Sequence, residues 1–271
     1  MVEPVLFIFT GILTGISAGL FGLGGGLIIV PVVTYSLISF SNIALDQAIL
    51  NGISTSLASM VITGAMATYA HTKNKNIDYQ IIHKFIAGII LGALLIGFII
   101  NFFPGKVLKN FFIIYTFLIA YRFYNYKANF IDIKQSDYNI FSIPNNFTSN
   151  LIGFIFSIIS GLVGIGGATL FVPYLIKKNI PTKLAIGTSS ALGFLIGLVA
   201  SISIFISSLY FDPLNNSMFG FIYLPAILFL TLPSLIFVQL SANWLLKISD
   251  QNVKRLFSLM LFIIGVVMVF N

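Results

Sequence analysis

GLFGLGGGLIIVP, residues 19–31, places four glycines within five positions inside a strongly hydrophobic segment. Glycine has no Cβ, so it permits positive φ angles and loosens a helix. Inside a bilayer, backbone that is not helical is tolerated only where protein covers it or where it lines a wet cavity. The stretch therefore predicts a break in a membrane helix, placed where the protein needs it.

The same break recurs in the second half of the chain. Residues 161–173 read GLVGIGGATLFVP, and seven of the thirteen positions are identical to those of 19–31, including both prolines. A second match aligns ISTSLASMVITG (53–64) with IGTSSALGFLIG (186–197). We therefore expect two related repeats, residues 1–126 and 148–271, joined by the polar linker 127–147.

The composition is that of a polytopic membrane protein with an all-α fold. Of 271 residues, 58% are hydrophobic and 8% are charged, whereas soluble domains carry about 25% charged residues. Eight hydrophobic segments can be distinguished: 5–40, 48–70, 79–103, 106–126, 148–177, 184–208, 219–246 and 252–270. The chain has no cysteine, which excludes disulfides and cysteine metal sites.

The distribution of Lys and Arg predicts how the segments lie in the membrane. If all eight segments cross once, six basic residues face one side and eight the other, without the usual cytoplasmic excess. If the second glycine segment turns back, the distribution becomes twelve against two, and only Lys106 and Lys109 dissent. We take the side with twelve as cytoplasmic and assign the net charge of +7 to this bias rather than to nucleic-acid binding.

The charge argument does not test the first glycine segment, which could still cross. Because its motif matches the second, we expect it to turn back as well. Each repeat is then a glycine-broken hairpin followed by three transmembrane helices, and the two repeats are inverted. Both termini lie outside and the linker 127–147 lies in the cytoplasm. Inverted repeats with broken helices are a common plan of transporters.

The broken helices are candidate anion sites. The arm after each break begins with amides that have no helical partner, at the positive end of the helix dipole. The candidate substrate-binding glycines are Gly22, Gly24, Gly25, Gly26, Gly164, Gly166 and Gly167. Pro31 and Pro173 are expected to end or kink the returning arms. The alternative for any of these glycines is close helix packing, which is our interpretation of Gly11-x-x-x-Gly15-x-x-x-Gly19, Gly88-x-x-x-Gly92 and Gly193-x-x-x-Gly197.

Hydroxyl groups at matched places are further candidates. Thr55, Ser56, Thr188 and Ser189 recur within hydrophobic segments and can donate hydrogen bonds to an oxyanion. The alternative is that each bonds the preceding turn of its own helix.

Acidic residues fall in loops or at segment ends, which argues against a cation or metal pathway. No nucleophile and base are paired within a hydrophobic segment, so we expect no enzyme activity, no metal and no cofactor. The two histidines, His71 and His83, flank one charged loop and are interpreted as interfacial.

The sequence resembles the TauE/SafE family of sulfite exporters and sulfonate permeases. The paired glycine motifs, their prolines and the Thr-Ser pair after each motif carry this resemblance. The resemblance covers nearly the whole chain, with one departure, since Gly26 aligns with Ala168. It implies a permease in the plasma (inner) membrane for sulfite, thiosulfate or organosulfonates.

The chain carries no ATP-binding motif, so we expect secondary transport by alternating access. Alternatives are a channel-like anion facilitator or a membrane subunit that does not transport. The expected partners are a small anionic solute and the lipid bilayer, without nucleic acid, and a homo-oligomer is left open.

Overall fold

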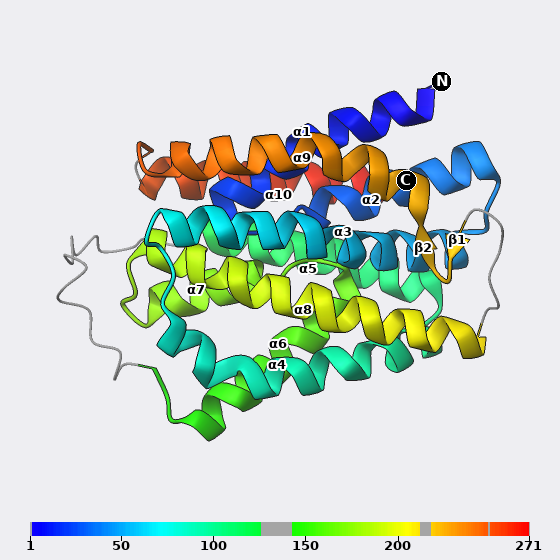
Figure 1. The fold of residues 1–271 in the computed structure, drawn as a ribbon. Helices are drawn as coiled ribbons and strands as arrows, with labels where there is room; N and C mark the ends of the chain where they lie inside the picture. Colours follow the sequence, from blue (N-terminus) through cyan, green and yellow to red (C-terminus); the bar gives the residue numbers. More distant parts are fainter. Residues whose placement is uncertain (1, 126–142, 212–217, 249, 271) are drawn as a thin grey trace.

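The computed structural model describes residues 2–125, 143–211, 218–248 and 250–270. Helices dominate this part of the chain, as Figure 1 shows. In chain order they are α1 (Val2–Phe21), α2 (Gly26–Ser41), α3 (Leu45–Lys73), α4 (Tyr79–Ile99), the 3₁₀ turn η1 (Ile100–Phe102), α5 (Gly105–Asn125), α6 (Asn146–Val163), α7 (Ala168–Lys177), α8 (Thr182–Phe211), α9 (Leu224–Leu245) and α10 (Asp250–Phe270). A short antiparallel pair, β1 (Met218–Phe219) and β2 (Ile222–Tyr223), precedes α9.

The described residues contain six helices that are long and apolar enough to cross a membrane: α1, α3, α4 with η1, α6, α8 and α9. The shorter helices α2 and α7 are also apolar, and so is the part of α10 from Ser258 to Val269. The expected all-α polytopic membrane fold is confirmed. Most of the predicted linker, with Lys127 and Lys134, lies outside the described residues.

Each glycine stretch interrupts its segment and turns the chain back. The first break lies between α1 and α2, and the second between α6 and α7. In Figure 1, α1 begins and α2 ends at the right of the bundle, whereas α6 begins and α7 ends at the left. We call α1 and α2 hairpin 1, with tip 1 at residues 22–27, and α6 and α7 hairpin 2, with tip 2 at residues 164–169. The two hairpins enter the bundle from opposite ends.

Helices of the two halves pack in a reciprocal pattern. The first arm of hairpin 1, α1, packs along α9, and the first arm of hairpin 2, α6, packs along α4. The long helices α3 and α8 pack on each other, and so do α5 and α10. Each hairpin is therefore held mainly by a helix of the other half.

Small residues permit these close contacts. A Cβ at Gly11 or Gly19 would overlap a backbone oxygen of α9, and one at Gly15 would lie 2.7 Å from another. A Cβ at Gly88 or Gly92 would overlap atoms of α6. The packing interpretation of these five glycines is confirmed.

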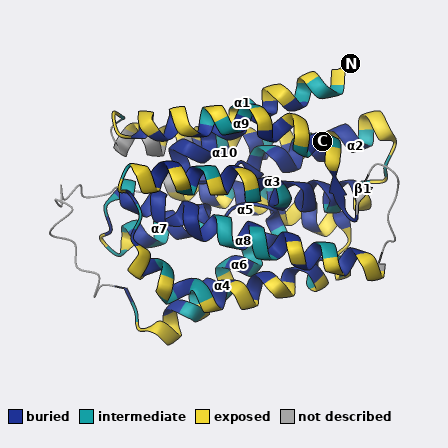
Figure 2. Ribbon diagram, viewed as in Figure 1, coloured by how far each residue is buried: buried dark blue, intermediate teal, exposed yellow. Residues whose placement is uncertain are grey.

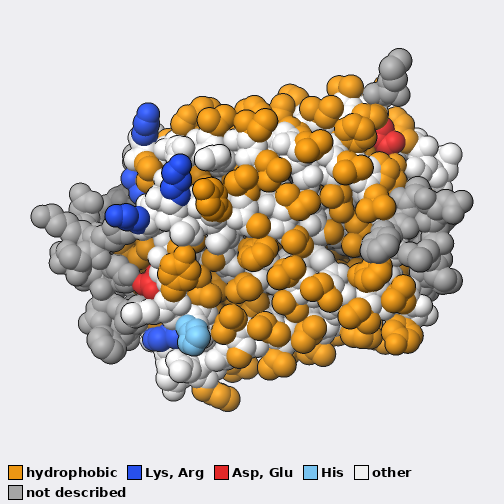
Figure 3. Space-filling view, viewed as in Figure 1, with side chains coloured by type: hydrophobic (Ala, Val, Ile, Leu, Met, Phe, Trp, Pro, Cys, Tyr) orange, Lys and Arg blue, Asp and Glu red, His pale blue; other side chains and the backbone are white. Residues whose placement is uncertain are grey.

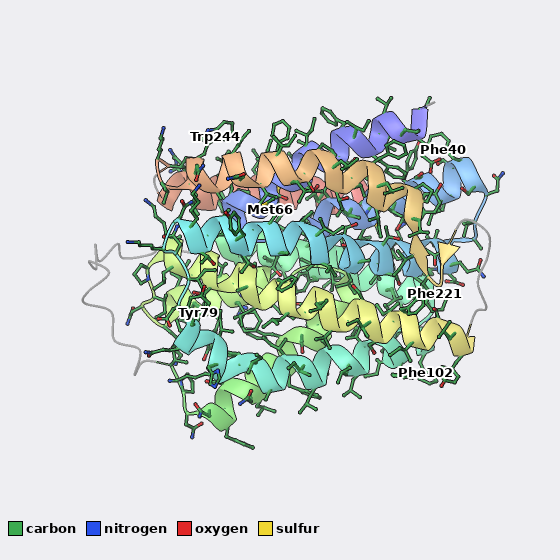
Figure 4. The ribbon with its side chains drawn as sticks, in the orientation of Figure 1. Phe40, Met66, Tyr79, Phe102, Phe221 and Trp244 are labelled. Atoms are coloured by element: carbon green, nitrogen blue, oxygen red, sulfur yellow. The ribbon has the colours of Figure 1, made fainter. Side chains whose placement is uncertain are left out.

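Side-chain chemistry marks the two ends of the bundle. Buried residues fill its centre (Figure 2), while hydrophobic side chains cover its waist and the visible Lys and Arg side chains gather at the left end (Figure 3). Figure 4 places Tyr79 and Trp244 toward that end and Phe40 and Phe102 toward the other. All four of these aromatic side chains are exposed, as expected for residues at two membrane–water interfaces.

Candidate functional site

The two tips meet in the middle of the protein. A Cβ at Gly26 would overlap the carbonyl oxygen of Gly164, and one at Gly166 would lie 2.7 Å from the carbonyl oxygen of Leu23. Both tips belong to one hydrophobic core through Leu23 and Ile165. Backbone from one half therefore touches backbone from the other half, and glycine is what allows this contact.

Four tip glycines adopt a backbone that other residues rarely adopt. Gly22, Gly24 and Gly25 have φ angles of 72°, 63° and 85°, and Gly164 has 70°. In contrast, Gly167 has a φ of −53°, but a Cβ there would lie 2.7 Å from Ile196 Cδ1. The breaks thus depend on glycine for conformation at four positions and for space at others.

Both returning arms begin with unpaired amides. Within the described part of the chain, no hydrogen bond is donated by the backbone amides of residues 24–27 or 166–169. All eight of these residues are buried. Buried backbone N–H groups without a partner are rare in native proteins, and here two sets of them lie at the positive ends of helix dipoles. This arrangement suits a negatively charged ligand.

The two threonines brace the opposite half of the protein. Thr55 Oγ1 on α3 accepts a hydrogen bond from the amide of Tyr223 at 2.9 Å, just before α9. Thr188 Oγ1 on α8 accepts one from the amide of Asp78 at 3.0 Å, just before α4. Both side chains are fully buried. Each threonine therefore holds the backbone that leads into a helix of the other repeat.

The two serines differ from each other. Ser56 donates a 2.6 Å hydrogen bond to the carbonyl oxygen of Gly164 in tip 2. Ser189 is fully buried, and its hydroxyl has no hydrogen-bond partner among the described residues. None of the four matched hydroxyls bonds the preceding turn of its own helix within this part of the chain, so that alternative is not what the structure shows.

Three further hydroxyls at the tips, those of Thr63, Tyr115 and Thr169, were not identified from the sequence. Thr63 donates to the carbonyl oxygen of Gly24 at 2.7 Å, and Tyr115 on α5 is hydrogen-bonded to Thr169 at the start of α7. Thr63 lies seven residues after Ser56, on the same face of α3. That spacing is a signal that could have found it, whereas no local pattern points to Tyr115.

The prolines do not end the returning arms. Pro31 lies inside α2, which continues to Ser41, and Pro173 lies inside α7, which continues to Lys177. The expectation that they end the arms is therefore wrong, and a kink at either proline stays a prediction. Each proline is the sixth residue of its helix, so it lacks only the amide that would bond the second residue's carbonyl.

The acidic residues of the described segments lie away from the tips. Asp78 caps α4 by accepting from the amides of Gln80 and Ile81. Glu3, near the start of α1, accepts from Ser36 Oγ at 2.6 Å and from the Tyr223 hydroxyl at 3.0 Å. Burial, followed by the hydrogen bond with Glu3, raises the pKa of Tyr223 to about 12. No group of three potential metal ligands occurs among the described residues.

The interfacial interpretation of His71 is wrong. The side chain is fully buried in the last turn of α3, beside the backbone of Gly19. One turn earlier, Ala67 packs with Ala18 of α1 and Val238 of α9. The end of α3 is therefore covered by α1 and α9, a contact that the sequence around His71 does not reveal. His83, in contrast, is exposed.

Removing either threonine hydroxyl should destabilise the fold. In Thr55→Val or Thr188→Val, the amide of Tyr223 or Asp78 loses its acceptor while staying buried, at a cost of about 1–3 kcal/mol. We expect a lower thermal unfolding temperature for the purified protein. Thr68→Val is the matched control, because the Thr68 hydroxyl bonds the carbonyl oxygen of Gly64 in the preceding turn of α3. Equal unfolding temperatures for the three variants would contradict the bracing role.

Comparison with known proteins identifies the family. The family model described as "Sulfite exporter TauE/SafE" matches residues 7–268. The chain belongs to the TauE/SafE family. The family assignment that the paired glycine motifs suggested is confirmed, and the protein is a multi-pass membrane transporter of this family.

Three curated relatives align with three quarters or more of the chain. A "Probable membrane transporter protein" of Haemophilus influenzae is 29% identical over 262 residues, which cover 97% of this chain and 96% of the relative. A protein of the same description from Methanocaldococcus jannaschii is 28% identical over 277 residues, covering 97% and 94%. The "Probable membrane transporter protein YunE" of Bacillus subtilis is 28% identical over 216 residues, covering 75% and 78%. No solved structure matches the chain.

Proposed function

We propose that this TauE/SafE protein is a secondary transporter of small sulfur-containing anions such as sulfite, thiosulfate or organosulfonates. The observation that carries the proposal is the pair of buried tips with unpaired amides at residues 24–27 and 166–169. An anion held at the helix breaks supplies acceptors of the kind that such amides lack. The tip glycines and the matched Thr-Ser pairs form or support this site.

The chemistry of the surrounding side chains favours an anion over a cation. Hydroxyls and amides face the tips, whereas the carboxylates of Glu3, Asp46 and Asp78 lie near helix ends. A cation or proton pathway needs an acidic group within the membrane. The sulfur in the substrate comes from the description of the family, which names sulfite, and the anionic charge comes from the geometry of the tips.

Alternating access follows from hairpins that enter from opposite ends. When one hairpin moves against the helices that hold it, the site opens toward that hairpin's end of the bundle. Pro31 and Pro173 weaken the second turn of each returning arm and are the proposed hinges. The end rich in Lys and Arg is the cytoplasmic one, so both termini lie outside the plasma (inner) membrane.

Uptake by reconstituted protein tests the function. Purified protein in liposomes is given radiolabelled sulfite, thiosulfate or an organosulfonate, with and without the same unlabelled anion inside. A carrier is expected to show uptake that is faster when the internal anion is present. Uptake without this acceleration would indicate a channel-like facilitator, and no movement of any sulfur oxyanion would overturn the proposed substrate class.

A further inference from the structure

One face of α8 lies directly against tip 2. A Cβ at Gly193 would lie 3.5 Å from the amide nitrogen of Gly167. One turn later, the Ile196 side chain reaches the place of a Cβ on Gly167. Ser189 lies one turn before Gly193, and residues four apart share a helix face. Gly193 and Ile196 therefore face tip 2, and Ser189 continues the same stripe of α8 one turn earlier.

The aligned stripe on α3 contacts both tips and carries a large side chain at the position that matches Gly193. In the alignment of 53–64 with 186–197, the partners of this stripe are Ser56, Met60 and Thr63. Met60 is buried, and its Cγ lies 2.9 Å from the place of a Cβ on Gly24. At the first tip a methionine side chain therefore occupies the position that Gly193 leaves without a side chain at the second tip.

Gly193 is the least crowded glycine of the chain. It is the one glycine among 23 whose added Cβ would meet no atom closer than 3.4 Å. Gly197, the other member of its small-residue motif, is tightly packed, since a Cβ there would lie 3.1 Å from Met60 Cβ. Helix packing thus accounts for Gly197 but does not require glycine at position 193.

The hydroxyls on the two stripes also differ in their hydrogen bonding. On α3, Ser56 and Thr63 donate to carbonyl oxygens of tip 2 and tip 1. On α8, the fully buried Ser189 hydroxyl makes no hydrogen bond with the described residues. A buried hydroxyl with no partner costs free energy unless a ligand uses it. The stripe hydroxyls of α3 are therefore committed to tip carbonyls, whereas the Ser189 hydroxyl of α8 remains available as a donor.

We propose that the two tips are not equivalent and that the transported oxyanion binds at tip 2, against the amides of residues 166–169 and the Ser189 hydroxyl. Gly193 leaves room for one anion oxygen in front of the Gly167 amide. Met60 closes the corresponding place at tip 1, which serves as a structural support. This inference rests on the proposed anion transport and names the residues that perform the binding.

Side-chain size at position 193 tests the inference. Gly193→Ala places a methyl group in front of the Gly167 amide without a clash, so anion affinity should fall about tenfold while the unfolding temperature without anion is unchanged. Gly193→Met copies tip 1 and should abolish binding. The matched control is Gly64→Ala on α3. Gly64 aligns with Gly197 and faces Phe194. Binding is measured as the rise in unfolding temperature with added sulfite or thiosulfate, and separately as uptake.

Neighbouring serines give a second test. Ser189→Ala removes a hydroxyl that has no hydrogen-bond partner among the described residues, so affinity should fall about tenfold without loss of stability. Ser190→Ala is the control, because the Ser190 hydroxyl bonds the carbonyl oxygen of Ile186 at 3.0 Å on its own helix.

The outcomes separate the two proposals. If the wild-type protein neither binds nor transports a sulfur oxyanion, the proposed function fails. If the wild-type protein binds the anion and both Gly193→Ala and Ser189→Ala bind it equally well, the assignment to tip 2 fails. A selective loss in these two variants, with Gly64→Ala and Ser190→Ala unaffected, supports it.

Discussion

Gly166→Val should abolish transport while the protein still inserts into the membrane. The added Cβ would lie 2.7 Å from the carbonyl oxygen of Leu23 and 3.0 Å from Met60 Cε. Tip 2 cannot then rest on tip 1, and the amides that begin α7 are displaced. Insertion depends on the hydrophobicity of the segment, which valine does not lower.

Gly24→Val should have the same effect from the other side. Its φ of 63° is unfavourable for a branched residue by about 1–2 kcal/mol, and its Cβ would meet Met60 Cγ at 2.9 Å. Both variants are measured by uptake into proteoliposomes, normalised to the amount of reconstituted protein. The control is Ile8→Val on the exposed face of α1. Uptake equal to wild type in either glycine variant would leave the tips a packing role only.

Gly88→Val should prevent the protein from folding, and not only from transporting. A Cβ at Gly88 would overlap the carbonyl oxygen of Asn150, and the Gly88 amide donates a 2.8 Å hydrogen bond to Asn150 Oδ1. A larger side chain forces α4 away from α6 and breaks this bond. Overpacking and a lost hydrogen bond together are expected to cost about 3 kcal/mol or more.

The measurement for Gly88→Val is the yield and homogeneity of protein extracted in mild detergent. We expect aggregation on gel filtration, whereas Ile90→Val, on the exposed face of the same helix, should elute like the wild type. A homogeneous Gly88→Val protein with the wild-type unfolding temperature would show that the close contact of α4 with α6 is dispensable.

Much of the fold was predictable because a bilayer responds to local properties of the chain. The eight hydrophobic segments correspond to α1 with α2, α3, α4 with η1, α5, α6 with α7, α8, the β pair with α9, and α10. Glycine clusters located both breaks, since positive φ angles at Gly22, Gly24, Gly25 and Gly164 need glycine whatever surrounds them. Charge asymmetry alone predicted that the second segment turns back.

The candidate site was predictable only in part. The sequence identified the glycines of both tips, because their repetition is visible along the chain. It did not distinguish Thr55, which braces Tyr223, from Ser189, which has no partner among the described residues. Both are small hydroxyl residues in apolar helices, and their roles depend on which backbone of the other half approaches them.

Sequence by itself determined the membrane class, the two breaks and the internal repetition of this TauE/SafE protein, because hydropathy, charge and glycine content act on each segment separately. Only the tertiary structure decided that His71 is buried, that the prolines lie within continuing helices, and that Gly193 leaves open the place that Met60 fills. The burial of His71 and the filling of the place beside Gly24 depend on which helices pack against each other, and such contacts leave no local pattern in the chain.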